Sequence, residues 1–149
     1  MPSNVSRNAF MVGAGIALFG ALIHWIAPWI GPDWYAFLHA PASIVTSART
    51  GTWLAPSGAV AIGALMFLCA LYALSGAGII RKIPLLRTAL VIITTICVLR
   101  GLALIPFLML VPSKLSGFDI VGSLVWLLAG VSFLLGTVGS WRQVKQHGG

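Results

Sequence analysis

The stretch that decides the fold is Thr88–Val111, which reads TALVIITTICVLRGLALIPFLMLV. Its only charged side chain is Arg100, and the other residues are apolar, small or threonine. A helix needs about 20 mainly apolar residues to cross the hydrocarbon core of a bilayer. The stretch therefore predicts a transmembrane helix.

Three further apolar runs of similar length flank it: Ala9–Ile30, Ser57–Ile80 and Asp119–Trp141. The chain is 59% hydrophobic and 7% charged, whereas a soluble domain carries about 25% charged residues. So few charges would not cover a water-facing surface, and disorder needs low hydrophobicity with high charge. We therefore expect an all-α polytopic membrane protein: one domain over residues 1–149, with four transmembrane helices in an up-down bundle.

The connection Gly31–Pro56 is too long for a simple turn between the first two helices. Pro32 and Asp33 suit the start of a helix, and apolar residues such as Trp34 and Phe37 follow at helical spacing. This pattern predicts a short interfacial helical segment. The segment either covers the outer end of the bundle as a structural element or covers a binding site there.

The basic residues are unequally shared between the two sides of the predicted bundle. The side of the two termini and the second connection has Arg7, Arg81, Lys82, Arg87, Arg142 and Lys145, and the opposite side has Arg49, Lys114, Asp33 and Asp119. Cytoplasmic segments carry an excess of Lys and Arg, so both termini should be cytoplasmic. The first apolar run exceeds a signal-peptide core of about 7–15 residues, which favours a retained helix.

The stretch ALSGAGIIRKIPLLR, Ala73–Arg87, and the string LRGL, Leu99–Leu102, resemble a group of small, uncharacterised four-helix inner-membrane proteins of bacteria. The resemblance implies a bacterial inner membrane as the location. It also implies that Arg100 belongs to a recurring LRGL element. It implies no activity, cofactor or partner.

Four ionisable residues are expected in the outer part of the bundle. Arg100 lies about 20 Å along its helix from Arg87, His24 lies at a similar height, and Asp119 and Asp33 mark helix ends. An arginine within the membrane costs about 2.5–3.5 kcal/mol, so it normally faces a partner, a cavity or a ligand. One hypothesis is a site formed by Arg100, His24, Asp119 and Asp33 for a lipid head group, a quinone or another amphipathic molecule. The alternative is a structural Arg100 that reaches the interface or pairs with Asp119.

Two prolines add unpaired backbone to the same region. Pro28 lacks the N–H that would bond the carbonyl of His24, and Pro106 likewise leaves the carbonyl of Leu102 free. Backbone carbonyls inside a membrane need another donor, and an arginine side chain offers five N–H groups.

Recognisable catalytic chemistry is absent from the sequence. It has no HExxH motif or His/Cys cluster for a metal, and His24 has no second intramembrane histidine for haem. Cys69 and Cys97 lie in apolar runs and are expected to act as small buried hydrophobes. We therefore expect no catalytic residue, metal or cofactor. The net charge of +7 lies in connections and tails, which favours lipid phosphate over nucleic acid as partner.

Small residues recur at four-residue spacing in Gly13–Ala17–Ala21, Ala59–Gly63 and Ser132–Gly136–Ser140. They predict close helix packing within the chain, or a homo-oligomer face.

The features of the sequence leave three functions open. The chain is an accessory or assembly subunit of a larger membrane complex, a binding or transport protein using the outer-half site, or a lipid- or quinone-modifying enzyme.

Overall fold

The computed structural model describes residues 3–110 and 116–146, with side chains up to residue 141. This part of the chain is helical and contains no strand. Four of its helical segments are long and apolar enough to cross a membrane: Asn4–Ile30, Leu54–Gly76, Leu86–Leu110 and Gly117–Trp141. The all-α class and the four predicted spans are confirmed, and the chain is a multi-pass membrane protein.

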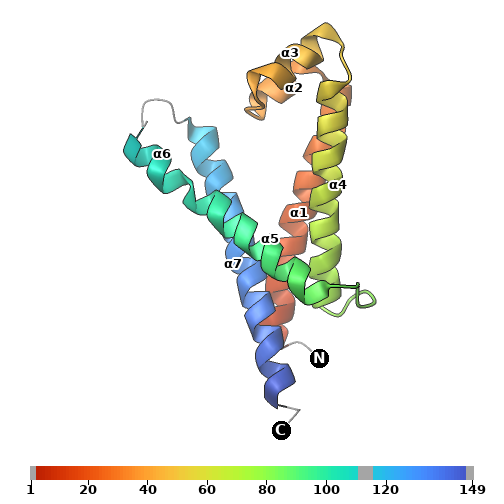
Figure 1. The fold of residues 1–149 in the computed structure, drawn as a ribbon, viewed down its shortest axis with the longest axis vertical. Helices are drawn as coiled ribbons and strands as arrows, with labels where there is room; N and C mark the ends of the chain where they lie inside the picture. Colours follow the sequence, from red (N-terminus) through yellow and green to blue (C-terminus); the bar gives the residue numbers. More distant parts are fainter. Residues whose placement is uncertain (1–2, 111–115, 147–149) are drawn as a thin grey trace. The chain divides into compact units, whose positions relative to one another are not determined.

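The helices follow one another in the order shown in Figure 1. Their bounds are α1 Asn4–Ile30, α2 Pro32–Phe37, α3 Ala42–Thr50, α4 Leu54–Gly76, α5 Leu86–Leu102, α6 Leu104–Leu110 and α7 Gly117–Gln146. Val111, the predicted end of the third span, and Lys114 in the connection after it lie outside the described residues.

Internal packing divides the chain into two compact units. Unit 1 comprises Met1–Ile16 and Cys69–Gly149, and unit 2 comprises Ala17–Leu68. The long helices α1 and α4 contribute a segment to each unit. The expectation of one domain over residues 1–149 stays a prediction.

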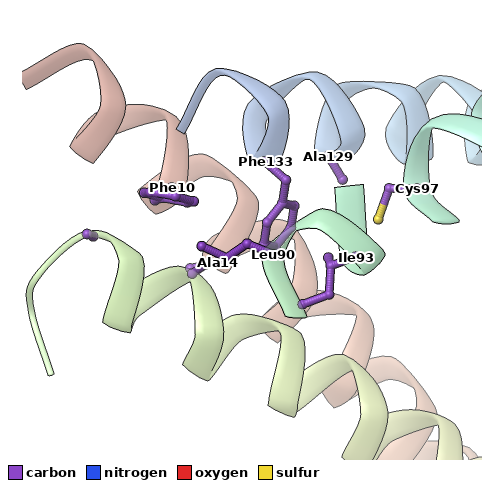
Figure 2. Packing of buried hydrophobic residues seen from close by; sticks show 9 residues of the cluster. Phe10, Ala14, Leu90, Ile93, Cys97, Ala129 and Phe133 are labelled. Carbon is purple, nitrogen blue, oxygen red and sulfur yellow. The ribbon is translucent and has the colours of Figure 1, made fainter. Parts of the chain in front are cut away.

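The core of unit 1 is built around two phenylalanine rings. Phe10 from α1 and Phe133 from α7 are almost completely buried, and Figure 2 shows them in one cluster with Leu90 and Ile93 of α5. Glycines make room for these rings: a Cβ atom on Gly136 would lie 2.6 Å from the Phe10 ring, and one on Gly13 would lie 3.1 Å from the Phe133 ring. The predicted packing within the chain is confirmed at both glycines.

Helices α5 and α7 cross in close contact within unit 1 (Figure 1). A Cβ atom on Gly101 of α5 would lie 2.8 Å from the Cα of Leu127, and one on Gly130 of α7 would lie 2.9 Å from the backbone nitrogen of Val98. Small residues allow helix backbones in membranes to approach in this way. The two glycines therefore fix where α5 and α7 meet.

The predicted third span is interrupted at Ala103, between α5 and α6. Pro106 lies one turn beyond Leu102 and has no N–H to donate to its carbonyl. The helical bonds on either side persist: Ala103 N–H donates to Leu99 O at 2.9 Å, and Phe107 N–H donates to Ala103 O at 3.4 Å. The break is thus the local effect of the proline.

The second span ends at Gly76, before the predicted Ile80. Gly78 adopts a left-handed conformation with φ of 73°, and Ile79 N–H donates back to Leu74 O at 3.0 Å. This is the helix ending in which a glycine without a Cβ atom tolerates the left-handed turn. The buried Ser75 hydroxyl then holds the connection, donating to Arg81 O and accepting from Ile83 N–H, each at 3.1 Å.

Unit 2 contains the predicted helical segment between the first two spans, as α2 and α3. Its core joins Ala27, Tyr35, Ala55 and Ala59, and the Trp34 indole N–H donates to Ile23 O at 3.1 Å. The helical nature of the segment is confirmed. Its position at the membrane interface stays a prediction.

Candidate functional site

The four predicted site residues are divided between the two units. Arg100 and Asp119 belong to unit 1, and His24 and Asp33 belong to unit 2. A common site formed by all four therefore stays a prediction.

Arg100 lies exposed in the last turn of α5. The buried side of this helix runs through Leu90, Ile93, Thr94, Cys97 and Gly101, whereas Ile96, Leu99 and Leu102 beside Arg100 are 56%, 63% and 43% exposed. Its guanidinium has no hydrogen bond or ion pair with residues 3–110 or 116–146. A cationic group thus lies on the exposed apolar face of a helix long enough to span a membrane.

Asp119 forms a reciprocal cap at the start of α7. Its Oδ2 accepts hydrogen bonds from the backbone N–H of Ser116 at 3.0 Å and from the Ser116 hydroxyl at 2.7 Å. The Ser116 Oγ in turn accepts from the backbone N–H of Asp119 at 3.3 Å. This is a capping box with aspartate at its third helical position, and the negative charge also suits a helix N-terminus. The spacing Ser-x-x-Asp was the sequence signal for this structural role.

His24 is partly buried in α1 and bonds to its own helix. Its Nδ1 lies 2.8 Å from the carbonyl oxygen of Gly20. Because a carbonyl only accepts, Nδ1 carries the proton and Nε2 is the acceptor of the neutral ring. The helix continues through Pro28 to Ile30, so the proline does not end α1.

Asp33 is exposed in the first turn of α2, directly after Pro32. Proline at the first helical position and an acidic residue in the first turn both favour a helix start. Its position is therefore explained by the formation of α2.

A groove between α5 and α7 was not predicted from the sequence. It consists of two neighbouring pockets, a cavity of about 150 Å³ and a more open hollow of about 430 Å³, which share Val91 and Trp141 in their linings. The cavity is also lined by Thr94, Thr95, Leu134, Thr137 and Val138, and the hollow by Arg87, Thr88 and Ile92. We call these residues together the α5–α7 groove.

Thr137 differs from Thr94 and Thr95, which line the same cavity. The hydroxyls of Thr94 and Thr95 donate to carbonyls one turn earlier, at 2.7 and 2.9 Å. The Thr137 Oγ1 is buried and has no hydrogen-bond partner within the described part of the chain. A threonine inside a helix can donate its hydroxyl to the carbonyl four residues earlier, as Thr94 and Thr95 do. The sequence contains no signal that Thr137 departs from this pattern.

Metal-binding chemistry is not seen in the residues described. They contain no group of three or more His, Cys, Asp or Glu side chains that would hold an ion. Cys69 is half-buried and Cys97 is buried in the core of unit 1, and both are free thiols.

No protein-family model, curated protein or solved structure matches the chain. The resemblance of Ala73–Arg87 and Leu99–Leu102 to small bacterial membrane proteins stays a prediction. The chemical features that the residues themselves provide are an exposed guanidinium on an apolar span and a groove with a cationic rim.

Proposed function

We propose that the chain is an accessory or assembly subunit of a larger membrane complex. The observation that carries this proposal is Arg100, a charged residue on the exposed face of an apolar span. A charge within the membrane is costly unless it meets a partner, a cavity or a ligand. A carboxylate or a free carbonyl on a helix of another subunit would supply that partner.

Two glycines with open space beside them in the described part of the chain support the same proposal. A Cβ atom added to Gly15 of α1 or to Gly122 of α7 would meet nothing within 4 Å. Glycine inside a helix is about 1 kcal/mol less favourable than alanine, and packing against the described residues does not compensate for that cost at either position. Small residues on a membrane helix allow a second helix to approach closely.

We further propose that the protein resides in a bacterial inner membrane with both termini in the cytoplasm. The charge distribution supports this orientation, because basic residues concentrate beside the termini and in the connection between α4 and α5. Fusions test it directly. Green fluorescent protein at the C-terminus should fluoresce, and alkaline phosphatase inserted after Gly51 should be active; the opposite pattern would contradict the orientation.

The subunit proposal is tested by extracting the protein gently from its own membrane and recording native mass spectra. The wild type should appear in an assembly with other subunits. Arg100→Leu should release it as a folded monomer, whereas Arg100→Lys should retain part of the assembly. Arg81→Leu, which removes an arginine from the connection before α5, is the matched control and should leave the assembly intact.

Two results would contradict the proposal. One is a wild type that is monomeric in every mild detergent tested. The other is an Arg100→Leu variant that remains fully assembled, because the exposed guanidinium would then contribute nothing to the contact.

The second candidate is a binding or transport protein using the predicted site of Arg100, His24, Asp119 and Asp33. The same exposed guanidinium favours it, together with the Nε2 atom of His24, which takes no part in the bond to Gly20. The native mass spectra distinguish the candidates. A monomer or homo-oligomer carrying a discrete small-molecule mass, lost in both Arg100→Leu and His24→Phe, would replace the subunit proposal with this one.

A further inference from the structure

The α5–α7 groove has a charged end and an apolar end. Arg87 and Trp141 line its open hollow, and Val91, Leu134 and Val138 line its cavity. Because α5 begins at Leu86 and Trp141 ends the apolar part of α7, the open end lies at the boundary of both spans. The groove thus passes from a cation and an indole at the boundary to aliphatic side chains within the spans.

The spacing along the two helices defines levels within the groove. The antiparallel contacts of Gly101 with Leu127 and of Gly130 with Val98, continued toward the start of α5, place Arg87 near Trp141 and Val91 near Thr137. One helical turn of four residues separates these levels, about 6 Å. Thr137, with its unpartnered hydroxyl, therefore lies about one turn deeper in the groove than Arg87.

We propose that the α5–α7 groove binds one anionic phospholipid from the adjacent leaflet. The phosphate contacts Arg87, and an acyl chain follows Val91 and Leu134. An ester carbonyl of the glycerol backbone accepts from Thr137 once its side chain rotates about χ1 and turns the buried Oγ1 toward the groove. The phosphate, ester and acyl chain of the lipid thus follow the same order as the cationic, hydroxyl and aliphatic side chains along the groove. Trp141 lies beside the head group, where the indoles of membrane proteins are enriched.

Charge and position favour this occupant over others. Arg87 supplies a positive charge at the lipid phosphate level, and basic residues at such positions attract anionic head groups. The unpartnered Thr137 hydroxyl needs an acceptor, because a buried hydroxyl without one is costly. Esterified lipids carry acceptors one step below the phosphate, whereas a second apolar helix offers few side-chain acceptors at that depth.

The test titrates delipidated protein with phosphatidylglycerol and with phosphatidylcholine of the same acyl chains, counting bound lipids by native mass spectrometry. The first bound phosphatidylglycerol should bind at least fivefold more tightly than phosphatidylcholine. Arg87→Gln should weaken that step about fivefold, in proportion to the loss of one basic residue at the membrane surface. Thr137→Val, which keeps the shape of the side chain, should weaken it for both lipids.

Arg81→Gln is the matched control, since Arg81 is exposed in the connection before α5 and does not line the groove. Equal losses in Arg87→Gln and Arg81→Gln would show general attraction to basic residues and overturn the site. If glycerol phosphate, which has no acyl chain, displaced bound phosphatidylglycerol as effectively as free phosphatidylglycerol does, the role of the apolar cavity would be overturned. Unfolding curves of each variant show that the fold is kept. The lipid site lies at the opposite end of α5 from Arg100. A result that overturns the lipid site therefore leaves the subunit proposal standing, and the reverse is also true.

Discussion

Substituting Gly101 by alanine should separate α5 from α7 and destabilise unit 1. The new Cβ atom would lie 2.8 Å from Leu127 Cα, Cβ and backbone nitrogen, whereas ordinary contacts begin at 3.4 Å. The atoms in the way belong to a helix backbone, so a side-chain rotation does not relieve the clash. One helix must move by about 0.6 Å, the difference between 2.8 and 3.4 Å. A gap of this size removes roughly a quarter of the van der Waals attraction between the atoms that it separates.

The free-energy change combines two opposing effects. Overpacking of this kind costs about 1–3 kcal/mol, and we expect the upper half of that range because the obstacle is backbone. Replacing glycine by alanine inside a helix gains about 1 kcal/mol. Gly101→Ala should therefore lower the free energy of unfolding by about 1–2 kcal/mol, the difference of these two effects.

Gly122→Ala is the matched control, because a Cβ atom there meets nothing within 4 Å. It keeps the gain from helix propensity without the clash, so the two variants should differ by about 2–3 kcal/mol. Unfolding of the purified protein by sodium dodecyl sulfate in mixed micelles measures both. Tryptophan fluorescence reports the transition, since Trp126 packs against the core of unit 1.

The reasoning would be refuted if Gly101→Ala were as stable as Gly122→Ala. Such a result would mean that α5 and α7 do not approach closely at Gly101. A loss in both variants would instead show that Gly122 has a packing partner.

Three further predictions concern single hydroxyl groups. Tyr35→Phe should raise the free energy of unfolding by about 1 kcal/mol, because the buried Tyr35 hydroxyl has no partner in the described residues. Burial also raises the pKa of Tyr35 above 10.0, so the contribution of the protonated Tyr35 to wild-type stability is fully present below pH 10 and is lost as pH rises through the folded-state pKa. Chemical unfolding between pH 8 and 11 should show this loss in the wild type and not in the variant. Ser116→Ala should cost about 1 kcal/mol and Ser116→Gly only a few tenths, in the same unfolding assay, because glycine also caps helices; equal effects would contradict the capping box. Ser75→Ala should cost about 1–3 kcal/mol and speed proteolysis between α4 and α5, whereas Ser57→Ala, whose hydroxyl bonds only its own helix turn, should do neither.

The four spans were predictable because they follow from length and composition alone. Helix ends were less predictable, since they depend on local backbone geometry. The second span ends at Gly76, two residues before Gly78, which takes a left-handed conformation. The third is broken at Ala103, upstream of Pro106. The proline was recognised in the sequence, but its effect on the preceding helix was predicted only as a free carbonyl.

The candidate site was less predictable than the fold. Arg100 stands out in the sequence because a charge in an apolar run is rare, but its partner depends on how helices face one another. Asp119 was grouped with it by position along the chain, and the structure shows it bonded to Ser116. The α5–α7 groove escaped prediction because it arises from the crossing of two helices, which sequence periodicity does not specify.

The hydrogen bond from the Ser6 hydroxyl to Gly136 O joins residues 130 positions apart, and Phe10 packs against the same glycine. During synthesis at about 5–20 residues per second, Gly136 of α7 is therefore added on the order of ten seconds after Ser6 of α1. Throughout that interval the Ser6 hydroxyl and the Phe10 ring lack their contacts with Gly136. The core of unit 1 is therefore completed only after Gly136 has been synthesised, and a chain that stops before Gly136 lacks the contacts that hold the start of α1 against α7.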